Sequence, residues 1–238
     1  MIMKRILFLF ASFLSLLPMR AQVGSTFSAP NADGVTLYYQ IISESPHEVG
    51  IQKPTDGTYY MASEINIPAE VVNPDNGLSY TVTEVMGYAF ENSSNLLRIN
   101  FPATIMKFGT RMFEGAHIPD FNFPEGLRTI SPRCFYGVKV QTPEAARDTV
   151  RLPASLTSSS SGFIYANFSL SDGYVLDLRA CTAITHISLN CFLSSNLTGI
   201  LLPETVKYID SDAFSGNSID TLVIPPLCRG SSPPFPRS

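Results

Sequence analysis

The sequence comprises 238 residues with 16 basic and 20 acidic side chains, 45% hydrophobic residues, four cysteines and no tryptophan. The excess of acidic residues argues against nucleic acid as a partner, because nucleic-acid-binding domains carry clustered positive charge. The chain is long enough to bury a sizeable hydrophobic core.

The first 21 residues have the layout of a secretory signal peptide. Lys4 and Arg5 form a short basic region, residues 6–17 are apolar but too few to span a bilayer, and Ala21 precedes the expected cleavage before Gln22. An uncleaved membrane anchor is the alternative interpretation. The remainder holds 13 basic and 20 acidic residues, a net charge near −7, and no other apolar run that could cross a membrane. We therefore predict an exported protein, either secreted or held at the cell surface.

Residues 22–62 lack the repeat found later and are predicted to form an N-terminal β cap. Residues 34–42 are rich in β-branched and aromatic side chains, which favours a strand. Residues 48–51 are suited to pair with this strand across a turn at Ser45-Pro46. A solenoid needs such a cap because its first repeat would otherwise expose its core to water.

A repeat dominates residues 63–228. In each copy an apolar residue is followed three positions later by a second apolar residue and eight positions later by phenylalanine. The five clear copies are Val82/Val85/Phe90, Ile105/Phe108/Phe113, Leu127/Ile130/Phe135, Ile184/Ile187/Phe192 and Val206/Ile209/Phe214. A degraded copy, Leu156/Ser159/Ile164, is separated from its neighbours by longer steps, and we expect it to form the weakest rung. A fixed period of 22 to 23 residues is typical of a solenoid.

A triplet of strand-forming residues precedes each return segment and ends at or near a proline. The triplets begin at Ile65, Ile99, Phe121, Val150, Ile200 and Leu222. The outer residues of a triplet are expected to face the core and the middle residue to face solvent, because side chains alternate along a strand. The return segments are too short for helices. We predict a β-rich, right-handed solenoid with a parallel sheet of about seven rungs, followed by a Pro- and Ser-rich tail at residues 229–238.

The repeat phenylalanines and the cysteines are interpreted as core residues. A stacked ladder of phenylalanines is favoured over an aromatic binding stripe, because the spacing matches the repeat. Cys134 and Cys191 precede repeat phenylalanines two repeats apart, about 10 Å, which is too far for a disulfide bond. We predict that they are buried free thiols. Cys228 occupies the first apolar position of a last, incomplete repeat, and Cys181 has no assigned role.

The candidate binding surface is the exposed face of the predicted sheet, formed by the middle residues of the triplets. These residues change from polar to apolar along the array, and Arg98 and Asp120 lie in the column beside them. An ordinary solvated sheet face is the alternative interpretation. The predicted binding residues, all expected to point into solvent, are Asn100, Asn122, Arg151 and Asp177.

No group of residues suggests catalysis or metal binding. His47, His117 and His186 lie far apart, without ligand-type spacing or a recognisable carboxylate partner. Asp210 and Asp212 are interpreted as turn residues that bond backbone N–H groups. The sequence contains neither a phosphate-binding loop nor a Gly-x-Ser-x-Gly nucleophile motif. We therefore expect no enzyme activity, no metal and no cofactor.

The repeat consensus, seen best in residues 96–113 and 197–214, resembles the BspA-like class of bacterial leucine-rich repeats. Residues 33–39, 65–68 and 78–90 are also similar to that family, and the likeness extends over residues 33–228. The sequence departs from the consensus at residues 156–164 and around Ala180-Cys181, where the proline is missing.

The resemblance implies a leucine-rich-repeat fold in an exported or surface protein of a host-associated bacterium. It further implies adhesion to host matrix proteins or to other cells, and it brings no catalytic residues. The expected function is a secreted or cell-surface binding module for proteins or glycans. A structural component of the envelope that binds bacterial surface molecules is the alternative.

Overall fold

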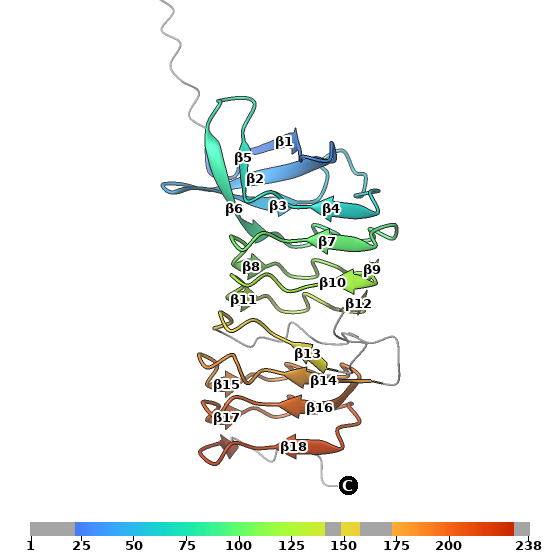
Figure 1. Ribbon diagram of the computed structural model, residues 1–238, viewed down its shortest axis with the longest axis vertical. Helices are drawn as coiled ribbons and strands as arrows, with labels where there is room; N and C mark the ends of the chain where they lie inside the picture. The colour runs from blue at the N-terminus through green and yellow to red at the C-terminus, as the bar shows by residue number, and fades with distance from the viewer. Residues whose placement is uncertain (1–21, 141–148, 158–172, 231–238) are drawn as a thin grey trace, which may run out of the picture.

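The structure is a computed structural model that describes residues 22–140, 149–157 and 173–230. It is an elongated stack of short strands that run across the long axis of the molecule (Figure 1). These ranges contain no helix, and hence no helix that could cross a membrane. The predicted signal peptide, part of the long step before the degraded copy, most of that copy and residues 231–238 of the predicted tail lie outside the described residues.

A small antiparallel unit forms the N-terminal end of the stack. It contains β1 (Thr26–Pro30), β2 (Thr36–Glu44) and β3 (His47–Gln52). β2 pairs with β3 across the turn at Ser45-Pro46, which confirms the predicted hairpin. β3 then pairs in parallel with β6 (Ser79–Val85), whose other partners are β5 (Glu70–Val72) and β8 (Lys107–Phe108). The cap and the first rungs therefore share one continuous sheet.

The predicted triplets form a row of parallel strands, here called the front strands. Those in the described residues are β4 (Glu64–Asn66), β7 (Arg98–Asn100), β10 (Asp120–Phe121), β13 (Thr149–Arg151), β14 (Tyr174–Asp177), β16 (Leu197–Leu201) and β18 (Thr221–Val223). They confirm the predicted β-rich solenoid with parallel strands. Their pairing forms a three-stranded and a four-stranded sheet rather than one sheet. The break between β10 and β13 coincides with the long step from Leu127 to Leu156.

Very short strands run back on the other side of each rung and are here called the return strands. They are β8, β11 (Thr129–Ile130), β15 (His186–Ile187), β17 (Tyr208–Ile209) and β19 (Arg229–Gly230). β9 (His117–Ile118), which directly precedes β10, forms a further parallel pair with β12 (Lys139–Val140). Two-residue strands suffice here because each pairs with its equivalent in the neighbouring rung.

The repeat phenylalanines stack along the axis of the solenoid, as the sequence predicts. Phe90, Phe113 and Phe135 form one run, with ring centroids 5.7 and 5.8 Å apart. Phe192 and Phe214 form another at 5.7 Å, with an angle of only 5° between the rings. All five side chains are buried. The inward residues of the triplets complete the core, although Phe101 and Phe123 are only partly buried and Ile224 is exposed.

The turn that carries each phenylalanine contains two residues in the left-handed backbone conformation. The residue two positions before the phenylalanine has a φ of 50–60° in all five clear copies, namely Tyr88, Arg111, Arg133, Asn190 and Asp212. The residue two positions after it is also left-handed, namely Asn92, Gly115, Gly137, Ser194 and Gly216. This conformation is costly for bulky L-residues, so the first of these positions stores backbone strain.

Replacing Tyr88 by glycine should therefore raise the free energy of unfolding by about 1 kcal/mol, because glycine adopts the left-handed conformation without a steric penalty. The Tyr88 side chain is exposed, so little packing is lost. Thr110, which has no left-handed backbone, is the matched control, and its change to glycine should lower stability. Urea denaturation of both variants measures the difference. Equal effects of the two glycines would contradict this account.

All four cysteines are free, as predicted for Cys134 and Cys191. Burial raises the pKa of the Cys134 thiol well above its usual value. Cys181 is also buried, and its thiol donates to the carbonyl oxygens of Leu152 and Pro153. Burial raises its pKa to about 11. Cys181 thus stands where other copies have proline, and it packs as a core residue.

Candidate binding surface

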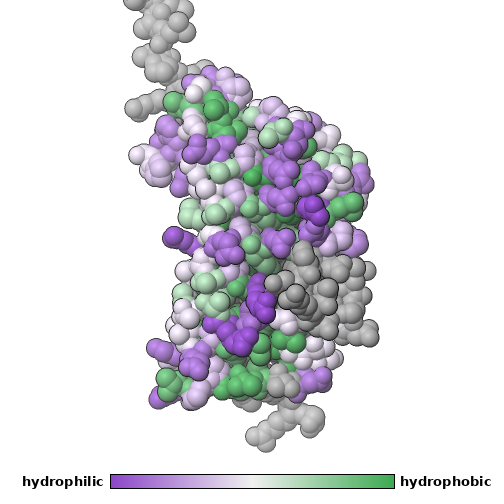
Figure 2. All heavy atoms as spheres, in the orientation of Figure 1, coloured by the Kyte–Doolittle hydropathy of each residue, from purple (hydrophilic) through white to green (hydrophobic). Residues whose placement is uncertain are grey.

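The front strands bring the predicted binding residues into register. Asn66 lies opposite Asn100, and Arg151 lies opposite Asp177 on the neighbouring strand. Asp177 in turn lies opposite Leu201, and Leu201 opposite Val223. The structure thus stacks Asn100 on Asn66 in one sheet, and Arg151 and Asp177 with Leu201 and Val223 in the other. Figure 2 shows the molecule in the same orientation as Figure 1.

The N-terminal part of this face is a ladder of side-chain amides. Nδ2 of Asn100 donates to Oδ1 of Asn66 at 2.6 Å and to Oε1 of Glu64 at 3.0 Å. Nδ2 of Asn66 donates to Oδ2 of Asp33 in the cap at 2.7 Å. Both amide N–H groups of Asn100 are therefore engaged within the protein, which orders the ladder and leaves Asn100 with fewer donors for a ligand. Asn122 is exposed at the end of this ladder.

The column beside the ladder carries alternating charges. Arg98 lies between Glu64, at 3.9 Å, and Asp120, to which its Nε and Nη2 both donate. The Arg98 and Glu64 side chains are about half exposed and Asp120 is 26% exposed, so the contribution of these ion pairs to stability is modest and decreases with salt. Their pairing also means that Arg98 and Asp120 do not present isolated charges.

Asp177 does not point freely into solvent, so that part of the prediction is wrong. It occupies the predicted place in the column, but only 6% of its surface is exposed. Its carboxylate accepts hydrogen bonds from the Arg179 backbone N–H and from Nε and Nη2 of the Arg179 guanidinium, at 2.8–3.0 Å. Nε of Arg151 lies 3.7 Å from Oδ2. Arg179 and Ala180 form a two-residue insertion relative to the other copies, which places an arginine over Asp177.

The hydrogen bonds from Arg179 hold the pKa of Asp177 below its usual range, against the opposing effect of burial. A lowered pKa contributes stability that is fully present above the pKa of the unfolded state and is lost as the pH falls through the folded-state value. Asp177→Asn should therefore destabilise the protein at neutral pH, and the difference from wild type should shrink on acidification from about pH 5 to about pH 2. Denaturation at several pH values measures this, with Asp220→Asn, an exposed aspartate, as the control. A difference that is independent of pH would contradict the prediction.

The C-terminal part of the face is apolar and hollowed. A groove of about 440 Å³ is lined by Arg179, Leu201, Leu202, Pro203, Glu204, Val223, Pro225 and Pro226. A second hollow of about 430 Å³ adjoins it and is lined by Arg151, Leu152, Asp177, Arg179 and Ala180. Arg179 belongs to both. Figure 2 shows strongly hydrophilic residues directly above hydrophobic ones in this half of the face.

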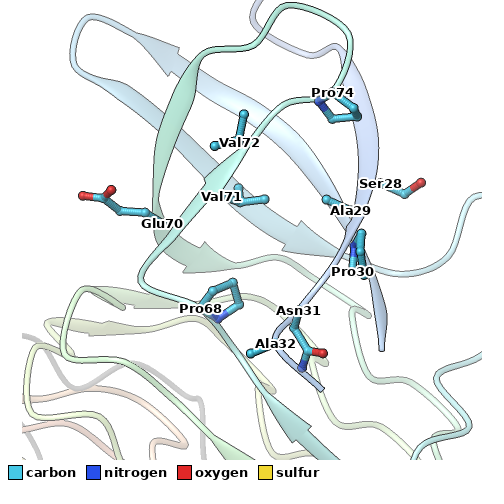
Figure 3. A pocket seen from close by; sticks show the side chains of 10 residues that line it. All are labelled: Ser28, Ala29, Pro30, Asn31, Ala32, Pro68, Glu70, Val71, Val72 and Pro74. Atoms are coloured by element: carbon cyan, nitrogen blue, oxygen red, sulfur yellow. The ribbon is translucent and has the colours of Figure 1, made fainter. Parts of the chain in front are cut away.

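A separate hollow of about 510 Å³ lies in the cap, between β1 and β5. These two strands are the free edges of the cap sheet. Figure 3 shows Ala29 of β1 and Val71 of β5 beside this space, whereas Glu70 points away from it. The hollow is mostly apolar, lacks an inward charge, and lies apart from the predicted face.

His186 has a carboxylate partner that the sequence analysis missed. Its Nε2 lies 2.9 Å from Oδ2 of Asp210 on the neighbouring rung. The two residues are 24 positions apart in the sequence and belong to adjacent return segments. Their proximity can be predicted only after the repeats have been aligned. Asp210 therefore bonds a side chain, and Asp212 accepts the Ser215 hydroxyl rather than a backbone N–H. The described residues contain no cluster of three or more metal-ligating side chains.

Parallel rungs, stacked phenylalanines and ordered front strands together define a leucine-rich-repeat solenoid. The family model for the BspA type leucine rich repeat region matches six copies, over residues 76–172 and 144–230. The chain therefore belongs to the BspA type leucine rich repeat family. Such a protein is a repeat module that presents an extended surface for binding.

Solved structures of bacterial leucine-rich-repeat proteins are similar to this chain. A leucine rich cell surface protein from Faecalibacterium prausnitzii aligns with a TM-score of 0.51 and 16% identity, covering 86% of this chain and 50% of that protein. A leucine-rich repeat protein from Bacteroides ovatus aligns with a TM-score of 0.39 and 20% identity, covering 82% of this chain and 59% of that one. The chain thus spans only half to three fifths of the length of these two proteins. No curated protein matches the sequence significantly.

Proposed function

We propose that this protein is exported and acts at the cell surface as an adhesive binding module, with its front strands as the contact face. The observation that carries the proposal is the ordered column of different chemistries on those strands. Amides, arginines and apolar side chains follow one another at strand spacing. A partner in contact with several rungs would meet all three, which provides specificity over an extended area.

Two features of the protein support its place outside the cell. The first 21 residues have the signal-peptide layout, and the similar Faecalibacterium prausnitzii structure is described as a cell surface protein. N-terminal sequencing of the protein recovered from culture medium or from the cell surface should find Gln22 as the first residue. Recovery of the intact sequence from Met1 would contradict cleavage at this position.

Binding rather than catalysis is the proposed mode of action. The ordered polar groups on the front strands bond to one another, and the buried Asp177 is engaged by arginine. A general base needs a carboxylate or imidazole that can reach a substrate, and Asp177 is unsuited to that role. The His186–Asp210 pair lies among the return segments, away from both hollows of the face.

The test is binding of residues 22–238 to immobilised host matrix proteins, mucins, glycans and bacterial envelope fractions. An Asn122→Arg/Val223→Arg variant places bulky charges on the front face after β10 and in β18, at exposed positions that should tolerate them. Leu189→Arg, at an exposed residue after a return strand, is the matched control. We expect saturable binding that the double variant loses and the control keeps.

Other outcomes of this test are equally informative. Binding to bacterial fractions alone would favour the structural envelope component over host adhesion. Equal binding by wild type and the double variant would exclude the front face as the contact surface.

A further inference from the structure

The hollow in the cap lies between two sheet edges that pair with no further strand in the described residues. We propose that this hollow takes up an extended segment of another protein, in which basic side chains flank an aliphatic one. The segment would add a strand between β1 and β5 and so complete the cap sheet. The site is separate from the front face, so this inference does not rest on the proposed function.

β1 presents a free backbone edge to the hollow. The N–H of Ile41 donates to the carbonyl oxygen of Ser25, and the N–H of Asn31 donates to that of Val35. Backbone groups alternate between the two sides of an antiparallel strand, so the odd-numbered residues of β1 face β2. Ser28, which lines the hollow, therefore directs its N–H and C=O to the other side, where the described residues include no partner strand.

β5 presents the matching edge. The N–H of Asn73, just after this strand, donates to the carbonyl oxygen of Leu78, so the odd-numbered residues here face β6. Glu70 and Val72 therefore direct their N–H and C=O groups away from β6, and no other described strand pairs with them. An added strand would find backbone donors and acceptors on both of its sides. Such main-chain hydrogen bonds supply much of the affinity when a peptide joins a sheet edge.

The inner side of the hollow suits an aliphatic side chain. Figure 3 shows Ala29 and Val71 beside the space, and both are small. The volume of about 510 Å³ leaves room for a larger apolar group. Side chains of neighbouring strands alternate together, so a residue opposite Val71 would point inward and the residues on either side of it would point outward. A valine, isoleucine or leucine at the inward position matches the apolar lining.

Prolines keep the open edges short. Pro30 ends β1, Pro68 and Pro74 flank β5, and proline has no N–H to donate. The open part of β5 is therefore limited to its three residues. The buried Asn31 also fixes the end of β1, because its Nδ2 donates to the carbonyl oxygen of Asn66 at 2.9 Å. Short edges of this kind favour a brief inserted segment over extended pairing between sheets.

The charge of the cap region favours a basic partner. Residues 22–85 contain eight acidic side chains, one lysine and no arginine. The lysine, Lys53, pairs with Glu91 outside this range. Only two of the eight acidic residues, Glu64 and Glu84, pair with basic side chains of the following rungs in the described residues. The N-terminal end of the molecule is therefore strongly negative, which attracts a positively charged segment.

Three of the remaining carboxylates belong to the rim of the hollow. Glu70 lines it, with its side chain pointing outward (Figure 3), and Asp33 and Asp75 directly follow the lining residues Ala32 and Pro74. None of these three carboxylates has an ion-pair partner among the described residues. An outward side chain opposite Glu70 would lie about 5 Å from it, so a lysine or arginine at that position would form a cross-strand pair.

The probe is a set of fluorescently labelled octapeptides in four classes. The central residue is Ile or Ser, and the two residues that flank it are both Lys or both Glu, in otherwise matched sequences. We expect residues 22–238 to bind the Lys-Ile-Lys class best, with a loss of about fivefold or more when either feature is changed. Fluorescence anisotropy measures the affinities. Raising the salt concentration should weaken the preference for Lys and leave the preference for Ile.

Substitutions in the cap assign each part of the site. Glu70→Lys should remove most of the preference for Lys, whereas Glu44→Lys, at the hairpin end of β2, makes the same change of charge away from the hollow and is the control. Val72→Pro removes one N–H of the open edge and should weaken binding of every class. Ala29→Leu should do the same by filling the hollow. Circular dichroism of each variant checks that the fold is retained.

Three results would overturn the inference. The first is equal binding of all four peptide classes. The second is undiminished binding of the Lys-Ile-Lys class by folded Val72→Pro and Ala29→Leu variants. The third is self-association of the wild type in sedimentation experiments that Val72→Pro abolishes, since the edges would then pair with a second copy of this chain. The proposed function is tested separately, because Asn122→Arg/Val223→Arg alters the front face and leaves the cap unchanged.

Discussion

Replacing Phe113 by alanine should lower the free energy of unfolding by about 3–5 kcal/mol. The side chain is fully buried in the middle of the phenylalanine ladder. Its ring lies 5.7 Å from Phe90, 6.4 Å from Phe108, 5.5 Å from Phe121 and 5.8 Å from Phe135. Alanine would leave a cavity bounded by three rungs, and stacked backbones cannot collapse easily to fill it.

Urea denaturation followed by circular dichroism measures this loss. Leu97→Ala is the control, because Leu97 lies on the same stretch of the array but is 52% exposed. The control should change stability by less than about 0.5 kcal/mol. A similar cost for both substitutions would mean that the ladder does not hold the rungs together.

Replacing Gly109 by alanine should destabilise the protein by about 1–3 kcal/mol, even though it adds only one methyl group. A Cβ atom at Gly109 would overlap the backbone of Met86 and Gly87 in the preceding rung. The neighbours in this case are backbone atoms, which cannot rotate away as a side chain can. The N–H of Gly109 also donates to the carbonyl oxygen of Val85 at 2.7 Å, so separating the rungs would stretch this bond.

The matched control is Ser131→Ala at the equivalent position of the next rung. Ser131 already carries a Cβ, so its change to alanine tests the loss of a hydroxyl without added bulk. Thermal unfolding of both variants should show a lower melting temperature for Gly109→Ala alone. Unchanged stability of Gly109→Ala would show that adjacent rungs can move apart at little cost.

The repeat pattern was sufficient to predict the solenoid, its front strands and its core. Phenylalanines at a fixed spacing, such as Phe90 and Phe113, can all be buried only if each repeat makes one turn. Prolines such as Pro102 and Pro124 indicated where each front strand ends. The left-handed residues were less evident, because Tyr88 and Arg111 occupy positions where glycine or asparagine would have been the signal.

The candidate face was predicted in position but not in detail. Register alone placed Arg151 beside Asp177, because equivalent residues of neighbouring rungs align. The burial of Asp177 depends on the insertion of Arg179 and Ala180, which places the Arg179 side chain over the carboxylate. The insertion interrupts the repeat, so the repeat pattern does not predict this contact. The pairing of His186 with Asp210 could not be predicted from spacing along the chain, because the two residues come together only through their positions in adjacent repeats.

The orientation of the strands also determines how the protein would respond to mechanical tension. The rungs in the described ranges lie across the long axis, and the cap is joined to the first of them through one shared sheet (Figure 1). Force along that axis would pull on the few hydrogen bonds between two neighbouring rungs. One pair of rungs would therefore separate before the next, and the bonds of many rungs would not be loaded together in shear. Each rung of 22 residues would release roughly 75 Å of extended chain. A protein built in this way lengthens stepwise under load, and the rungs that remain stacked keep their shape.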